Sequence, residues 1–108
     1  MARKFIEIGG KPYRVEANWN AISEFLDDRG KKLSDMEHFQ DFNTGDLNTL
    51  LYRSVEEGER LEGRDLGMTK KDFLALMGAG TLIEFLTIFT KQYVPEGESE
   101  EAGSEKKA

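Results

Sequence analysis

The sequence predicts an α+β fold: an N-terminal β-hairpin packed on a bundle of about four helices, followed by a disordered acidic C-terminal tail. Three observations predict it. Two β-rich runs flank a Gly-Gly pair, most of the remaining chain repeats apolar residues at helical spacing, and large apolar residues are absent beyond Pro95. With 108 residues there is room for one domain. We therefore expect a single domain over residues 1–94 and a Glu-, Gly- and Ser-rich tail over residues 95–108.

The hairpin is predicted over Lys4–Ile8 and Lys11–Glu16, with Gly9 and Gly10 between them. A two-residue hairpin loop needs positive φ at its central positions, which glycine adopts without steric cost. In each run alternate apolar residues share one face. Because a two-stranded ribbon alone is marginal in water, this face must lie on helices or gain strands from another copy.

The first predicted helix spans Asn18 to Arg29. Asn18 can accept a hydrogen bond from a free amide of the first turn, and Gly30 can adopt the left-handed conformation that ends a helix. The apolar residues at helical spacing are Trp19, Ile22, Phe25 and Leu26. We expect this stripe to face the core.

A less regular segment follows, in which Ser34 and Glu37 read as a capping box before one or two helical turns. Helical spacing of leucines then resumes from Asp46 to about Glu57. Ser54 and Gly58 fall in the same stripe, and such small residues let a neighbouring backbone approach closely.

The last third of the chain holds two further predicted helices. Residues 59–67 read as a charged connection, after which Thr69 caps a short helix. Gly78-Ala79-Gly80 is expected to break the pattern. A new capping box, Thr81 with Glu84, then starts a final helix from Leu82 to about Tyr93, which Pro95 ends.

The final helix is apolar over most of its circumference. Leu82, Phe85, Leu86, Phe89 and Tyr93 form one stripe, and Ile83 and Ile88 widen the apolar arc to roughly 220°. A helix packed on one side needs about half of that width. Either this helix is central in the domain, or its flank is covered by another protein molecule. The candidate protein-contact residues are therefore Ile83, Ile88, Phe89 and Tyr93.

Catalytic, cofactor and metal sites are not expected. The chain has no Cys, so it offers no thiol nucleophile. Its one His, His38, cannot form a two-His metal site, and a lone exposed His is more often solvated than catalytic. Acidic residues are abundant, but those around Glu57 alternate with arginines and read as a solvated face. The sequence predicts a non-enzymatic protein.

Charge and hydropathy exclude two more classes of partner. The net charge is −6, of which residues 96–108 hold five acids and two bases, and the rest of the chain has no basic excess. Phosphate neutralisation supplies most nucleic-acid affinity, so nucleic acid is not expected as a partner. The apolar stretch from Phe73 to Phe89 contains two glycines and is slightly short for a bilayer, so no membrane partner is expected either.

The order of these features resembles the tail assembly chaperones of long-tailed bacteriophages and prophages. The resemblance covers roughly Lys4 to Tyr93 and is carried by the hairpin sequence Phe5-Ile6-Glu7-Ile8-Gly9-Gly10-Lys11-Pro12-Tyr13-Arg14-Val15, the aromatic-led helix after Asn18, the Leu-rich helix and the two final helices. It implies a non-enzymatic protein that coats the tape measure protein and helps to recruit tail tube subunits. It also implies self-association, action in the cytoplasm of the bacterial host, and absence from the mature virion.

Two alternatives remain open. A structural phage tail or head–tail joining protein could have the same small α+β composition. A small cytoplasmic adaptor could use its acidic tail to attract a basic partner. Presence in purified virions separates the first alternative from the chaperone, and a long coiled-coil-rich reading frame immediately downstream is expected for the chaperone but not for the adaptor.

Overall fold

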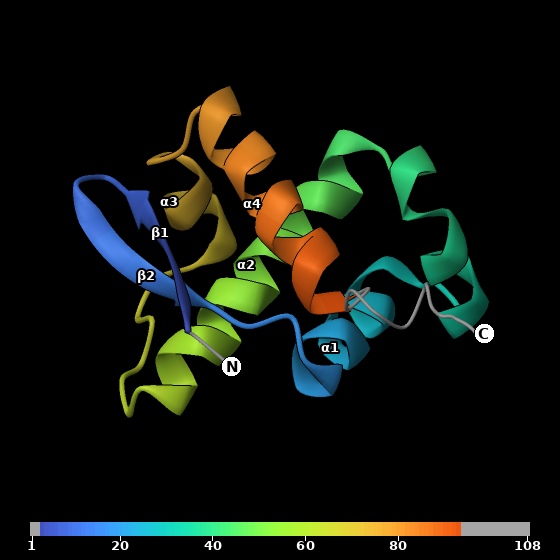
Figure 1. Cartoon of the computed structure of the whole chain (residues 1–108), viewed down its shortest axis with the longest axis horizontal. Coiled ribbons are helices and arrows are strands. Elements are labelled where there is room, and N and C mark those ends of the chain that lie inside the picture. Colours follow the sequence, from blue (N-terminus) through green and yellow to red (C-terminus); the bar gives the residue numbers. More distant parts are fainter. Residues whose placement is uncertain (1–2, 94–108) are drawn as a thin grey trace.

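The computed structural model describes residues 3–93. Within them two strands and five helical segments follow one another (Figure 1). These are β1 (Lys4–Ile8), β2 (Lys11–Val15), α1 (Trp19–Arg29), the 3-10 helix η1 (Leu33–Asp41), α2 (Thr44–Leu61), α3 (Lys70–Leu74) and α4 (Ala79–Tyr93). The predicted α+β fold with an N-terminal hairpin and four α-helices is confirmed. The predicted tail over residues 95–108 lies outside the described residues.

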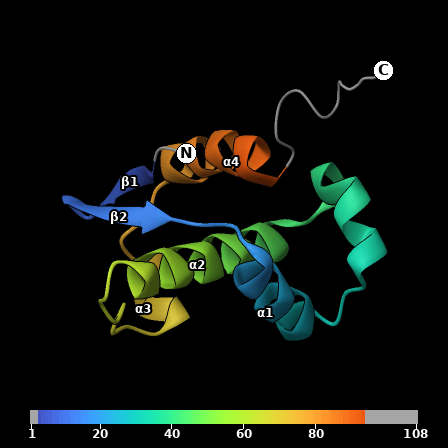
Figure 2. The same cartoon turned by 60° about the horizontal axis from the view of Figure 1, so that its bottom comes forward.

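The hairpin forms where the sequence predicts it. β1 and β2 pair antiparallel with Ile6 opposite Tyr13, and Gly9 and Gly10 turn the chain with φ of 59° and 83°. The alternation of side chains buries one face of the ribbon, made of Ile6, Ile8, Tyr13 and Val15. This face lies between α2 and α4, because α2 packs against β2 and α4 packs against β1 (Figure 2).

Contact between β2 and α2 is backbone on backbone. The amide of Glu16 donates to the carbonyl oxygen of Ser54 at 3.0 Å. A Cβ atom placed on Gly58 would overlap the carbonyl of Arg14, so only glycine fits at this position. The prediction that Ser54 and Gly58 admit a neighbouring backbone is confirmed.

Helix α1 begins and ends at its predicted caps. The Asn18 side chain accepts from the amide of Ala21 at 3.1 Å, and Gly30 lies in the left-handed region with φ 62°. The expected apolar stripe is wrong at one position, since Trp19 is 60% exposed while Phe25 is fully buried. Trp19 is the first residue of the helix.

The middle of the chain differs from expectation in its caps. The amide of Lys32 donates to Asp35 Oδ2 at 2.9 Å, so η1 begins before the predicted Ser34–Glu37 box, and His38 kinks it with φ −125° and ψ 39°. Helix α2 is longer than predicted. A capping box between Asn43 and Asp46 starts it, and it continues to Leu61 instead of stopping near Glu57.

Helix α3 has the predicted cap, since Thr69 Oγ1 accepts from the amide of Asp72 at 3.1 Å. The predicted break between the last two helices is present at residues 75–78. Helix α4 begins earlier than predicted, at Ala79, so Gly80 lies in its first turn and Thr81 does not cap it. Glycine keeps its backbone N–H, and its entropic cost of roughly 0.5–1 kcal/mol relative to alanine is too small to prevent a helix from starting there.

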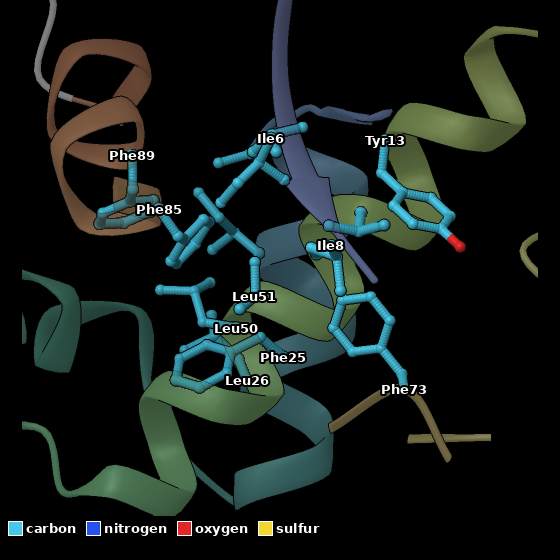
Figure 3. Close-up of a cluster of buried hydrophobic side chains, with 14 of the residues drawn as sticks. Ile6, Ile8, Tyr13, Phe25, Leu26, Leu50, Leu51, Phe73, Phe85 and Phe89 are labelled. Atoms are coloured by element: carbon cyan, nitrogen blue, oxygen red, sulfur yellow. The ribbon is translucent and has the colours of Figure 1, made fainter. Parts of the chain in front are cut away.

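One hydrophobic core joins the hairpin to all these segments. Its largest fully buried side chains include Phe25, Phe73, Phe85 and Phe89, with Leu50 and Leu51 from α2 between them (Figure 3). η1 contributes Met36, which is fully buried. The core therefore lies between α2, α1 and the hairpin, with α4 and α3 closing its sides.

Candidate protein-binding surface

The four predicted contact residues all lie on α4, but they differ in how far they are exposed to solvent. Ile83 is 66% exposed, the largest exposed fraction among the large hydrophobic residues described. Ile88 and Tyr93 are partly buried and pack against the core. Phe89 is fully buried. Ile83 therefore lies on the surface, whereas the other three face the domain to different degrees.

The structure does not support Phe89 as a residue that contacts another protein, because its side chain is fully buried. Its ring lies 5.2 Å from that of Phe39 and 5.8 Å from that of Phe85, measured between ring centroids, and it stacks on Tyr93 at 5.3 Å. This aromatic cluster ties α4 to η1, so exposing Phe89 would open the core. Tyr93 lies at the edge of the same cluster, where burial raises the pKa of its hydroxyl.

Around Ile83 the outer face of α4 carries no charge. Ala79, Ile83, Leu86, Thr87 and Thr90 fall within an arc of about 100° on the helix. We call these five residues the α4 strip. Leu86 is partly buried and the other four are exposed. The charged residues Glu84 and Lys91 lie beyond one edge of this arc.

The two threonines of the α4 strip do not depend on water for hydrogen bonding. Thr87 Oγ1 donates to the carbonyl of Ile83 at 3.3 Å, and Thr90 Oγ1 donates to the carbonyl of Leu86 at 2.8 Å. Because both hydroxyls have acceptors within the helix, a partner can cover them without breaking a hydrogen bond. The α4 strip is therefore suited to burial against an apolar surface.

A recess continues the α4 strip at the start of the helix. It has a volume of about 410 Å³ and is lined by Thr44, Asn48, Leu74, Met77, Gly78, Ala79 and Leu82. Nearby, Leu76 in the connection between α3 and α4 is 47% exposed. Sequence analysis missed both features, because the residues come from three segments whose proximity only the fold decides.

Three carboxylates are buried: Asp46, Glu57 and Glu59 are each less than 7% exposed, although Glu57 and Glu59 were expected on a solvated face. Glu57 accepts hydrogen bonds from Arg60 Nε at 2.9 Å and from Asn18 Nδ2 at 2.8 Å. The hydrogen bond from Arg60, followed by those from the asparagines, outweighs burial and lowers the pKa of Glu57 to about 2. The prediction of a solvated acidic face is wrong at Glu57 and Glu59.

The other two buried carboxylates hold segments together. Glu59 accepts from Arg64 Nε at 2.7 Å and from the amide of Arg14 on β2 at 3.1 Å. The hydrogen bond from Arg64 is the main cause of the lowered pKa of Glu59. Burial opposes ionisation of Asp46, but hydrogen bonds from Arg29 and the Asn43 amide lower its pKa overall. These groups are ionised near neutral pH and have structural partners, so none is poised for proton transfer.

A recess of about 490 Å³ between α1 and α2 is lined by charged side chains that are already paired with one another. Arg53 forms ion pairs with Glu24 at 3.2 Å, Asp28 at 2.7 Å and Glu56 at 2.7 Å. Arg60 is paired with Glu57 on the same wall. With its guanidinium groups already bonded to carboxylates, this recess offers little to a phosphate or to a nucleic acid.

Among residues 3–93 no group of three His, Asp or Glu side chains is placed to hold a metal ion. None of the helices described is both long enough and apolar enough to span a membrane.

The chain matches no protein-family model, and no match was found among curated proteins or solved structures.

Proposed function

We propose that this protein is a non-enzymatic tail assembly chaperone of a long-tailed bacteriophage or prophage, and that the α4 strip binds an apolar helical face of the tape measure protein. It would act in the cytoplasm of the host, help to recruit tail tube subunits, and leave before the virion is complete. This assignment follows the resemblance of the sequence to that family.

One observation carries the choice of surface: the most apolar helix of the domain buries only two of its residues, Phe85 and Phe89. The wide apolar arc has two explanations, a central helix or a covered flank. Because α4 packs at the side of the domain, the first explanation does not account for Ile83. An exposed, uncharged helix face is the feature that a helical partner recognises through residues spaced at three and four.

The spacing of the α4 strip suits a long helical partner. Ile83, Leu86 and Thr90 recur over two turns along one line of the helix, which two packed helices share as ridges and grooves. The recess beside Ala79 extends this line and could receive one large apolar side chain. A protein that coats an extended partner needs a contact of this repeating kind.

The test is co-purification of the full chain with the product of the long coiled-coil-rich reading frame expected immediately downstream of its gene. Light scattering coupled to size exclusion measures the mass of the complex. We expect the native chain to form a stable complex and the Ile83→Asp variant to lose it. A charge placed at the centre of an apolar contact must be desolvated without a partner.

Gln40→Asp is the matched control, because Gln40 is exposed on η1 and the substitution adds the same charge. It should retain the complex. Circular dichroism of both variants should match the native spectrum, since Ile83 and Gln40 are exposed. Absence of a complex with the native chain, or presence of the chain in purified virions, would contradict the chaperone assignment. An intact complex with Ile83→Asp would contradict the choice of the α4 strip.

A further inference from the structure

A second surface, at the C-terminal end of α4, carries the reverse of the chain's overall charge. It is a groove of about 270 Å³ between the start of β1, the end of β2 and the last turn of α4. Four basic residues and one acidic residue line it, namely Arg3, Lys4, Arg14, Lys91 and Glu16, together with Ala17, Asn18 and Gln92. We call it the basic groove. The whole protein, in contrast, has a net charge of −6.

Part of this positive charge is already balanced within the fold. Arg14 bonds to Glu62 at 2.9 Å and to Glu16 at 3.1 Å, and Arg3 bonds to Glu62 at 3.1 Å. Lys4 and Lys91, both exposed, take part in no ion pair within residues 3–93. The two lysines therefore give the groove its free positive charge, one from each wall.

Neither Arg14 nor Gln92 offers a free donor to a ligand in the basic groove. Two guanidinium nitrogens of Arg14 donate to Glu62 and Glu16, and its Nε is buried, out of reach of a ligand that enters from solvent. Gln92 does not compete for such a ligand, because its side chain already accepts from the Ala17 amide at 2.8 Å and donates to the Val15 carbonyl at 3.0 Å.

The residues that follow α4 have the complementary chemistry. Four of the six residues 96–101 are Glu, and no basic residue occurs from Glu96 to Glu105. Glu96 is three residues beyond Tyr93, a separation that an extended chain spans in at most about 11 Å. Lys91 and Gln92 line the groove within the last turn of α4. A tethered segment this close to its site has a high effective concentration there.

We propose that the acidic segment 96–101 of the same chain binds in the basic groove, with its carboxylates on Lys4 and Lys91. The proposal does not depend on the proposed function, because the basic groove and the α4 strip share no residue. Its consequence for recognition is that an acidic partner must displace this segment before it can use the groove.

The absence of cysteine allows a direct test with a single spin label. The full chain with Ala102→Cys carries a nitroxide at the end of the acidic segment, and its effect is measured on the amide NMR signals of β1 and β2 near Lys4 and Arg14. β1 and β2 are far from residue 102 along the chain, so the nitroxide affects their signals only when the acidic segment lies near the groove. At low ionic strength we expect these signals to be lost, and in about 1 M salt, where screening acts beyond about 3 Å, we expect them to return.

Two variants of the labelled chain separate binding from mere proximity. Replacing Glu98, Glu100 and Glu101 by Gln should restore the β1 and β2 signals, and so should Lys4→Gln combined with Lys91→Gln. The matched control, Lys32→Gln combined with Lys71→Gln, removes two exposed lysines elsewhere and should leave the signal loss unchanged. Signal loss that is the same in the acidic and the Gln segments would overturn the proposal.

A mixture of isotope-labelled chains without the nitroxide and unlabelled chains with it detects binding between molecules. Signal loss in that mixture would show that the segment of a second copy occupies the groove, and would overturn the intramolecular assignment. We expect the β1 and β2 signals of the mixture to keep their full intensity. The same spectra report folding, because the dispersion of the core amide signals should be identical in every variant.

Discussion

Helices α2 and α4 both pack on the hairpin, yet they reverse the usual relation between composition and burial. Helix α2 carries six charged residues in 18 and buries nine residues. Helix α4 carries two charged residues in 15 and buries two. The difference comes from position: α2 contacts α1, β2, α3 and α4, whereas α4 lies at one side of the domain. Whether a helix is buried depends on the segments that surround it. Its own apolar content determines only how much burial would contribute to stability.

Each of the two helices has residues whose polarity does not match their burial: buried carboxylates in α2 and an exposed isoleucine in α4. In α2 the buried carboxylates Asp46, Glu57 and Glu59 are paired with arginine, lysine or amide donors. In α4 no such compensation exists for Ile83, which stays exposed. The buried charges of α2 are therefore explained within the chain, whereas the exposed apolar face of α4 has no such explanation and is the surface to which we propose that a partner binds.

The largest expected effect tests the two faces of α4 against each other. Phe89→Ala removes a fully buried ring and should lower the free energy of unfolding by about 3–5 kcal/mol. Ile83→Ala on the exposed face should change it by no more than about 0.5 kcal/mol. Urea denaturation of both variants, followed by circular dichroism, measures the difference. Equal losses would show that both faces are buried in solution.

Gly58→Ala tests the close contact between α2 and β2. The new Cβ would overlap the Arg14 carbonyl, and because backbone cannot move aside as a side chain can, we expect a loss of about 3 kcal/mol. Gly80→Ala in α4 is the control, since open space surrounds its Cβ position and alanine favours the helix by about 0.5–1 kcal/mol. Thermal unfolding should therefore move in opposite directions in the two variants. A shift in the same direction would contradict the backbone packing.

The smallest expected effect is the contribution of a buried carboxylate of α2 to acid stability. The pKa of Glu57 is lowered from 4.5 to about 2 in the folded protein, so its contribution to stability is complete above pH 4.5. As the pH falls from 4.5 through 2, folded Glu57 must take up a proton and this contribution is lost. Glu57→Gln should be less stable than the native chain at pH 6 and should lose less stability over that range.

Glu7→Gln is the matched control for the acid titration, because Glu7 is exposed on β1 and forms no ion pair within residues 3–93. Its unfolding curve should follow that of the native chain. Free energies of unfolding measured in urea at each pH give the comparison. Parallel curves for the native chain and Glu57→Gln would show that Glu57 is solvated, as the sequence alone suggested.

Local signals were sufficient for most of the fold. The Gly9-Gly10 turn, the Asn18 cap, the Gly30 stop and the Thr69 cap each depend on backbone conformations or hydrogen bonds within a few residues, so the sequence specifies them directly. The close approach of a backbone to Ser54 and Gly58 was predictable for a similar reason, since the absence of a large side chain permits it whichever segment is the neighbour. The hairpin followed by helices was therefore predictable.

Only the tertiary structure decided which side chains of each segment are buried and which are exposed to solvent. The sequence gives the width of the apolar arc on α4, but not which edge faces the core, and so Phe89 and Ile83 could not be told apart. It gives the acids and bases around Glu57 and Glu59, but not that β2 and α1 cover them. Periodicity is a property of one segment, whereas burial depends on which other segments pack against it, and that choice is made by the whole chain.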